Sequence, residues 1–349
     1  MTMESGSDKK PLLGMTIEEL QTVVAELKMP KFTASQIAQW LYEKRVTGIE
    51  SMTNLSKQNR EKLSQLYTVG RKSSAGEARS KDGSAKYLFE VAGGKMVESV
   101  YIPDNDRGNE RATLCVSSQA GCKMGCRFCM TGKQGFHGNL TANEIINQIF
   151  SIPEAERLTN IVYMGMGEPT DNLDEVLKTV RIMTEKWGLA WSPKRITVST
   201  IGAIPGLQRL LRETHVHIAI SVHSPFHEER KELMPIEAAF PVSKVMELLR
   251  GYDFAHQRRL SVEYIMWRGV NDDDNHADAL ASLLKGTSAR VNLIRFHAIP
   301  GVALNTSDER RMTAFRDYLN SKGVLCTIRR SRGEDIMAAC GMLAGKKLK

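Results

Sequence analysis

The 349-residue sequence predicts an α/β protein, either an α/β barrel or an open parallel sheet, that follows a small helical domain and a β-hairpin. From residue 111 onward, short apolar β-rich runs alternate with helical patterns, which is typical of parallel strands joined by helical crossovers. Before that point, helical patterns come first, and two β-rich runs then flank the turn Gly93-Gly94.

The first helical pattern covers residues 16–28 and opens with Thr16-x-x-Glu19, the spacing of a capping box. Its apolar side chains recur at helical spacing, so they predict a buried face rather than a binding site. Together with the helical patterns that follow, it predicts an accessory domain over residues 1–72. The later patterns cover residues 32–46 and 54–67.

Residues 73–103 are predicted to hold a linker and the hairpin. The stretch 71–84 is rich in Ser, Gly and charged residues, and therefore predicts a linker or an exposed loop. The β-rich runs at 85–91 and 95–103 flank the turn Gly93-Gly94 and predict the two paired strands of a hairpin.

Residues 104–349 are predicted to form the catalytic domain. The ends of its β-rich runs are rich in glycine and polar residues, and α/β barrels place their chemistry at the C-terminal ends of strands. The runs cover residues 111–118, 160–167, 195–202, 215–223, 260–267, 290–297 and 324–330.

The net charge of +8 and the pI of about 9.1 favour a polyanionic partner such as a nucleic acid, although a slightly basic surface would give the same numbers. Part of this charge lies in a C-terminal tail with Lys346, Lys347 and Lys349. No apolar run is long enough to cross a membrane, and the N-terminus lacks the apolar core of a signal peptide. We therefore expect a cytoplasmic protein without a membrane partner.

Three cysteines fall within eight positions, directly after the first run of the catalytic region: Cys122, Cys126 and Cys129. Thiolates at this spacing can converge on one iron–sulfur cluster. A [4Fe–4S] cluster held by three cysteines keeps one iron open to another ligand. Two alternatives remain at this point, a zinc site completed by Cys115 or a distant residue, and a chance grouping of buried thiols.

Several longer motifs carry a resemblance to a known family. The sequence is similar to the RNA adenine methyltransferases of the RlmN type, in the radical S-adenosylmethionine superfamily, from about residue 16 to 345. The resemblance implies a partial (β/α)6 barrel with an N-terminal accessory domain that binds RNA. The motifs are "RATLCVSSQAGCKMGCRFCMTGKQGF", "MGMGEP", "STIG", "HSP" followed by "LMPI", "VNLI" and "RGEDIMAACGMLAG".

The resemblance also implies the cofactors and the residues that hold them. Cys122, Cys126 and Cys129 match the ligands of a [4Fe–4S] cluster. His297 stands where the family has an asparagine that contacts the cofactor S-adenosylmethionine. Other positions match the remaining contacts to this cofactor: Gly167, Glu168, Ser199, Ser221, Val222 and His223.

The implied reaction is methylation of carbon 2 of an adenine in 23S ribosomal RNA and in certain transfer RNAs, with two S-adenosylmethionine molecules per turnover. Cys340 matches the cysteine that is itself methylated, and Cys115 matches its redox partner. Glu98 matches a proton acceptor, and either Glu98 or the Cys115 thiolate could be the base. A flavodoxin- or ferredoxin-like electron donor and a monomeric state are also expected.

Other functions remain open at this point. A resistance branch that methylates carbon 8 of the same adenine shares all these cysteines, although "GKQGF" and "RGEDIMAACG" are closer to the carbon-2 branch. A radical enzyme acting on proteins or small molecules would not need the positive charge or the helical domain. A non-catalytic RNA-binding protein with a zinc knuckle is the third alternative.

Overall fold

The computed structural model describes residues 9–104, 111–254 and 258–345, and these form two compact units. The lysines of the C-terminal tail, Lys346, Lys347 and Lys349, lie outside the described residues. Among the described helices, none is both long and apolar enough to cross a bilayer.

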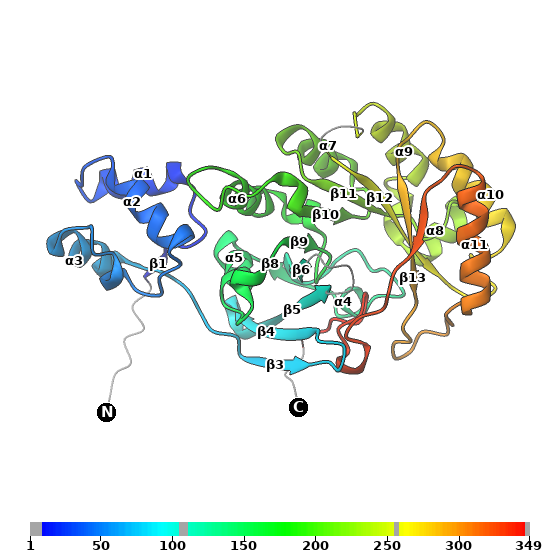
Figure 1. The fold of residues 1–349 in the computed structure, drawn as a ribbon, viewed down its shortest axis with the longest axis horizontal. Coiled ribbons are helices and arrows are strands. Elements are labelled where there is room, and N and C mark those ends of the chain that lie inside the picture. The colour runs from blue at the N-terminus through cyan, green and yellow to red at the C-terminus, as the bar shows by residue number, and fades with distance from the viewer. Residues whose placement is uncertain (1–8, 105–110, 255–257, 346–349) are drawn as a thin grey trace. The chain divides into compact units, whose positions relative to one another are not determined.

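The first unit begins with three helices, α1 (Ile17–Glu26), α2 (Thr33–Ala38) and α3 (Lys57–Leu66) (Figure 1). The predicted capping box is confirmed, because the Thr16 amide donates to Glu19 Oε2 at 2.8 Å and the Glu19 amide donates to Thr16 Oγ1 at 3.4 Å. The second predicted helix is shorter than expected, and continues as one π-helical turn over Gln39–Glu43.

Two later helices, α5 (Ala142–Phe150) and α6 (Leu173–Thr184), also pack within this unit. Ion pairs of 2.8 Å join α6 to α1, from Lys178 to Glu19 and from Arg181 to Glu18. A short parallel pair, β1 (Lys10–Pro11) and β2 (Tyr67–Thr68), closes the N-terminal segment. The compact unit is therefore larger than the helical patterns at the N-terminus indicate.

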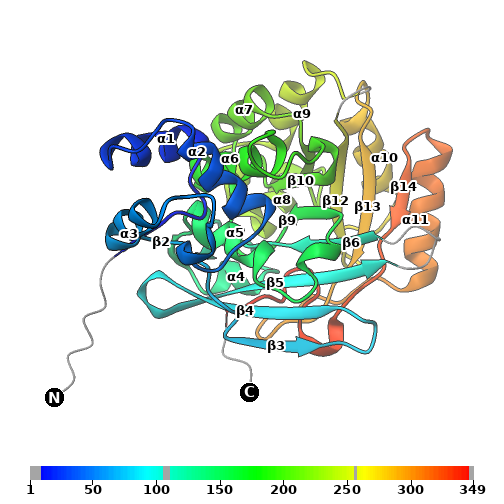
Figure 2. The ribbon, with the colours of Figure 1, turned by 60° about the vertical axis from the view of Figure 1, so that its left-hand side comes forward.

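The second unit contains a ten-stranded sheet in the order β14-β13-β12-β11-β10-β9-β6-β5-β4-β3. The strands from β6 to β14 in this order pair in parallel, which confirms the predicted fold class (Figure 2). These strands are β6 (Arg111–Cys115), β9 (Asn160–Tyr163), β10 (Ile196–Thr200), β11 (His217–Ser221), β12 (Leu260–Met266), β13 (Arg290–Arg295) and β14 (Cys326–Ile328).

From β10 to β14, helices of the second unit separate the parallel strands along the chain, as the sequence predicts. Figures 1 and 2 show α9, α10 and α11 outside the curved sheet. All seven residues of β12 are buried, because strands flank it on both edges and both its faces are covered. The helices are α7 (Ile204–Glu213), α8 (His227–Leu233), α9 (Val242–Arg250), α10 (Asp274–Leu284) and α11 (Glu309–Ser321).

The antiparallel end of the sheet contains the predicted hairpin, formed by β4 (Ala85–Val91) and β5 (Lys95–Asp104). The expected loop over 71–84 is wrong in part, because β3 (Gly76–Arg79) pairs with β4 as the edge strand. Residues 76–79 show little strand pattern, since their side chains are charged or small and none is fully buried.

Candidate active site

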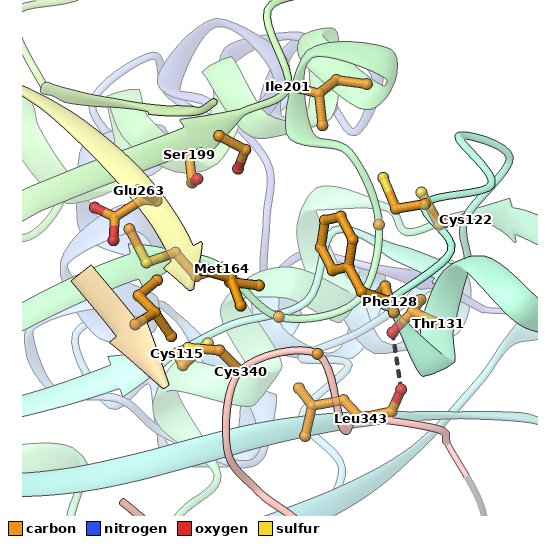
Figure 3. Close-up of a pocket in the computed structure, with 18 of the residues that line it drawn as sticks. Cys115, Cys122, Phe128, Thr131, Met164, Ser199, Ile201, Glu263, Cys340 and Leu343 are labelled. Atoms are coloured by element: carbon orange, nitrogen blue, oxygen red, sulfur yellow. Dashed lines mark hydrogen bonds between the residues drawn. The ribbon is translucent and has the colours of Figure 1, made fainter. Parts of the chain in front are cut away.

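The parallel strands of the second unit surround a cavity of about 190 Å³ (Figure 3). Figure 3 shows Cys122 and Phe128 toward one side of this cavity, and Glu263, Met164, Cys115 and Cys340 toward the other. The residues that were proposed from the sequence and that line it are Cys115, Cys122, Cys126, Cys129, Gly167, Glu168, Ser199, Ser221, His223 and Cys340.

The loop with the three clustered cysteines follows β7 (Gln119–Gly121) and ends in the short helix α4 (Met130–Lys133). All three thiols are free and half-buried. Burial raises the pKa of Cys122 to about 12 and that of Cys126 well above its usual value, and the neighbouring thiolate charges add to both shifts. Three thiolates here would therefore repel one another strongly unless a cation is bound.

The three thiols fit an iron–sulfur cluster. In a cluster each cysteine binds a different iron atom, so the sulfur atoms need not converge on one point. Among the described residues, no three His, Cys, Asp or Glu side chains are placed to hold a single metal ion. The donor set is all sulfur, which suits iron–sulfur chemistry.

Glu168 lies in the turn after β9, where it is buried at 3 % exposure. Its Oε1 accepts hydrogen bonds from the amide and hydroxyl of Thr170, at 3.1 and 2.6 Å, and its Oε2 accepts one from the Ile201 amide at 3.1 Å. Burial raises the pKa of Glu168, and these donors oppose the rise. The carboxylate is therefore oriented rigidly at the cavity wall.

Gly167 has a φ of +99°, and a Cβ at this position would lie 2.5 Å from Cβ of Gln119. The Glu168 amide donates to Oε1 of the same glutamine at 2.9 Å. Glycine is therefore required for the close approach of this turn to β7.

His223 follows β11 and has a positive φ of 60°, which is unusual for a residue with a side chain. Its Nδ1 accepts a hydrogen bond from the Ile265 amide at 3.0 Å, so Nε2 carries the proton of the neutral ring. Burial, helped by the charge of Arg230, lowers the pKa of His223 to about 3. At neutral pH the imidazole is therefore an uncharged donor beside the cavity.

Cys115, the last residue of β6, and Cys340, in the segment after β14, line the same cavity although they are distant in sequence. Burial raises the pKa of Cys115 to about 12, with a contribution from Cys340. Cys340 is exposed within the cavity, yet desolvation by the surrounding protein also raises its pKa, and the charge of Arg329 opposes the rise.

The segment that carries Cys340 is held by two hydrogen bonds that its main-chain carbonyls accept from helix α4. The Met130 amide donates to the Gly341 carbonyl at 2.8 Å, and Thr131 Oγ1 donates to the Leu343 carbonyl at 2.8 Å (Figure 3). These contacts tie the C-terminal segment to helix α4, directly after the cysteine loop.

Glu98 is buried in β5 and does not line the cavity. Its Oε1 pairs with Lys86 Nζ at 3.2 Å, and its Oε2 accepts a hydrogen bond from the Ala344 amide at 2.9 Å. The structure therefore places Glu98 behind the segment that carries Cys340.

Two other residues proposed from the sequence also lie off the cavity. Val222 is fully buried, and its amide donates to the Glu263 carbonyl at 3.1 Å. His297 lies after β13, with Nε2 3.0 Å from Ser331 Oγ and Nδ1 3.3 Å from a carboxylate oxygen of Glu334.

Two charged residues that were not predicted from the sequence also line the cavity, Glu263 in β12 and Arg329 after β14. Glu263 is only 4 % exposed, and its Oε2 lies 3.5 Å from Arg329 Nη1. A lone carboxylate inside the apolar run LSVEYIMW was a usable signal, because an unpaired buried charge is costly. Arg329 was counted only toward the net charge.

Two family models match the chain. The radical SAM superfamily matches residues 116–280, and the ribosomal RNA large subunit methyltransferase N-terminal domain matches residues 10–69. A solved radical SAM methyltransferase from Sphaerobacter thermophilus superposes with a TM-score of 0.89 at 36% identity, over 97% of this chain and 100% of that one.

Curated relatives extend the likeness over nearly the whole chain. A protein of Bacteroides thetaiotaomicron is 59% identical over 97% of this chain and 97% of its own length, and one of Parabacteroides distasonis is 57% identical over 97% and 98%. Both are named probable dual-specificity RNA methyltransferase RlmN. A dual-specificity RNA methyltransferase RlmN of Nitratiruptor is 44% identical over 97% of this chain and 98% of its own.

These matches confirm the resemblance stated from the motifs. They also confirm the predicted cofactors, since the radical SAM superfamily is defined by a [4Fe–4S] cluster and S-adenosylmethionine, and the three free thiols fit the cluster. The chain belongs to the RlmN family of dual-specificity RNA methyltransferases within the radical SAM superfamily.

Proposed function

We propose that this protein methylates carbon 2 of an adenine in 23S ribosomal RNA and of an adenine in the anticodon loop of some transfer RNAs. The reaction runs through a methylated Cys340 and a covalent protein–RNA adduct. The observation that carries this proposal is that Cys115 and Cys340 line one cavity together with the three clustered cysteines. The relatives named as dual-specificity RNA methyltransferases support the class of substrate.

Cys122, Cys126 and Cys129 would hold the [4Fe–4S] cluster. When both cofactors are bound, they supply a methyl group and, after one-electron reduction, a radical that can remove a hydrogen atom. Val222 and His297 lie off the cavity and would act through the backbone and the C-terminal segment that they contact. The cavity residues that would contact S-adenosylmethionine are Gly167, Glu168, Ser199, Ser221 and His223.

The role of Cys340 follows from the chemistry of adenine. Carbon 2 is not nucleophilic, so it cannot take a methyl group directly from a sulfonium. The Cys340 thiolate can take that methyl group and become a thioether. After the thioether methyl loses a hydrogen atom, its carbon adds to carbon 2 and joins the protein to the RNA.

The adduct then has to be resolved. The adenine loses the proton of carbon 2 to a base, Glu98 or the Cys115 thiolate, and a bound cluster would supply the acceptor for the remaining unpaired electron. The Cys115 thiolate next attacks the sulfur of Cys340, which breaks the bond between that sulfur and the methylene carbon. The electron pair of this bond and one proton complete the methyl group. The resulting disulfide is reopened by a reductant.

We assign RNA binding to the accessory domain over residues 1–72, on the strength of its match to the N-terminal domain of ribosomal RNA methyltransferases and of the net charge of +8. The catalytic domain over residues 104–349 then acts on the bound RNA, and residues 73–103 connect the two. A flavodoxin- or ferredoxin-like protein would supply electrons to a monomeric enzyme in the cytoplasm.

Nucleoside mass spectrometry tests the proposal. Ribosomal and transfer RNA from cells with the gene should contain 2-methyladenosine, and RNA from cells without it should not. Cells that carry only the Cys340→Ala variant are the matched control and should resemble the deletion. If 8-methyladenosine is found instead, the protein belongs to the resistance branch. If the RNA is unchanged and the protein contains stoichiometric zinc, an RNA-binding zinc knuckle is supported.

A further inference from the structure

Glu263 and Arg329 form a charged pair in the wall of the cavity, and the mechanism above does not use them. They come from β12 and from the residue after β14, two strands that are separated in the sheet by β13. The pair lies in the wall of the same cavity as the two reactive thiols, Cys115 and Cys340.

Hydrogen bonds hold the side chain of Glu263 and the main chain of Arg329. Glu263 Oε1 accepts a hydrogen bond from Asn292 Nδ2 at 2.8 Å and one from Ser261 Oγ at 3.3 Å. Arg329 is fixed through its amide, which donates to the Leu293 carbonyl at 2.8 Å. Its Nη1 also lies 3.8 Å from the sulfur of Met164.

One oxygen of the Glu263 carboxylate has no hydrogen-bond donor among the described residues. Glu263 Oε2 is buried and accepts no hydrogen bond from the described residues, and its only charged contact is Arg329 Nη1 at 3.5 Å. A buried acceptor without a hydrogen bond destabilises the folded protein, so its retention beside a cavity indicates a donor that is supplied by a ligand.

We propose that Glu263 and Arg329 read the edge of the target adenine, with Glu263 Oε2 accepting from the exocyclic amino group and Arg329 donating to ring nitrogen 1. This inference rests on the proposed function, because it requires adenine as the substrate. On the Watson–Crick edge of adenine, carbon 2, nitrogen 1 and the amino group follow one another. Carbon 2 at the two thiols therefore places nitrogen 1 near Arg329 and the amino group near Glu263.

The pair would also reject guanine. Guanine presents an oxygen at position 6 and a hydrogen on nitrogen 1, so an acceptor would face an acceptor and a donor would face a donor. A site built to bind a donor discriminates strongly against a base without it, since its buried polar groups are then left unpaired. The Glu263–Arg329 pair is thus a specificity device for adenine.

The test uses two RNA oligonucleotides that differ only at the target base, adenine or unsubstituted purine, which lacks the amino group. Kcat/KM for methylation is measured with the wild type and with Glu263→Leu. For adenine the substitution should lower kcat/KM by about tenfold or more, and for purine it should change kcat/KM by less than about twofold. The intrinsic reactivity of purine differs from that of adenine, but it cancels in the ratio of variant to wild type.

Two further variants separate base reading from a structural role. Glu263→Gln keeps one amide oxygen as an acceptor. With adenine RNA, its kcat/KM should therefore lie between those of the wild type and of Glu263→Leu. Glu237→Gln is the matched control, because Glu237 pairs with the buried Arg230 but does not line the cavity. Any loss of kcat/KM in Glu237→Gln should be the same for adenine RNA and purine RNA. The proposal is overturned if Glu263→Leu lowers kcat/KM by the same factor with both bases. It is also overturned if the kcat/KM of the wild type is no higher for adenine RNA than for purine RNA.

A third oligonucleotide tests the assignment of nitrogen 1. On the other edge of adenine, nitrogen 7 lies between carbon 8 and the same amino group, so the pair could also read that edge. RNA with 7-deazaadenine at the target should be methylated within about twofold of adenine RNA. A loss of tenfold or more would overturn the placement of nitrogen 1 on Arg329. Failure of the proposed function would look different, because the wild type would then form no 2-methyladenine on the adenine RNA.

Discussion

Cys115 and Cys340 share a cavity but have different surroundings. Cys115 is buried at the end of a strand, whereas Cys340 is exposed within the cavity, on a segment whose carbonyls accept hydrogen bonds from helix α4. The exposed thiol suits a group that takes up a methyl and reaches the RNA. The buried thiol suits a group that acts only after the adduct has formed.

This difference predicts opposite outcomes for two alanine variants. Cys340→Ala removes the methyl carrier, so neither methylated RNA nor a covalent complex should form. Cys115→Ala removes the thiolate that resolves the adduct, so protein cross-linked to RNA should accumulate. A denaturing gel shows the complex as a slow, nuclease-sensitive band. The assignment of the two thiols is wrong if Cys115→Ala turns over like the wild type or if Cys340→Ala forms the band.

The resolution of the adduct should also depend on pH. Because the pKa of Cys115 is raised to about 12, most of this residue is a thiol at neutral pH. Its thiolate fraction rises about tenfold per pH unit below that pKa. The covalent complex formed in a single turnover should therefore decay faster as the pH rises from about 7 to 9, and should accumulate at the lower pH. A decay rate that is constant or falls with pH would contradict attack by this thiolate.

At the scale of elements, the turn after β9 depends on its glycine. The positive φ of Gly167 and the 2.5 Å approach to Gln119 Cβ would both oppose a side chain there. Glu168, the next residue, is held by hydrogen bonds to Thr170 and Ile201. A shift of this turn would therefore move the carboxylate that we assign to the cofactor.

Gly167→Ala should weaken the binding of S-adenosylmethionine and destabilise the protein by about 1–3 kcal/mol. Gly94→Ala is the matched control, since Gly94 also has a positive φ, 68°, but no atom lies within 4 Å of its added Cβ. It should lose about 1 kcal/mol of stability and keep its affinity for the cofactor. Calorimetric titration and thermal unfolding measure the two effects. Equal cofactor affinity in both variants would show that the turn tolerates the change.

At the scale of the whole molecule, the cysteine loop is separate from the main sheet. It lies between β7 and β8 (Phe136–Asn139), which form a two-stranded sheet of their own. Phe128 of the loop packs in the buried core with Trp267 and Phe296, but the strands of the ten-stranded sheet are hydrogen-bonded to one another without the loop. The fold should therefore persist when the cluster is lost.

Replacing Cys122, Cys126 or Cys129 with alanine should strip the iron and abolish cleavage of S-adenosylmethionine, while the circular dichroism spectrum stays that of the wild type. Cys326→Ala is the matched control, because Cys326 is a buried cysteine of β14 that does not line the cavity. This variant should keep its iron. Full iron content in a variant of any of the three clustered cysteines would refute the cluster assignment.

Features that depend on near neighbours in the chain could be predicted from the amino-acid pattern alone. Strand–helix alternation, the capping box of Thr16 and Glu19, and the hairpin around Gly93 each follow from a local pattern, because hydrogen bonds and side-chain faces repeat over a few residues. The spacing of the clustered cysteines is local in the same sense. The charged edge strand β3 has no alternation of apolar and polar residues, so it was not predicted.

Contacts between residues that are distant in the chain become visible only in the folded protein. Cys115 and Cys340 could be paired from the sequence only through the resemblance to a family, and Glu263 and Arg329 were not paired at all. The physical reason is that periodicity indicates the face of a strand but not the side chains opposite that face. In a curved parallel sheet, strands that are not neighbours direct side chains into one cavity, as β12 and the end of β14 do here.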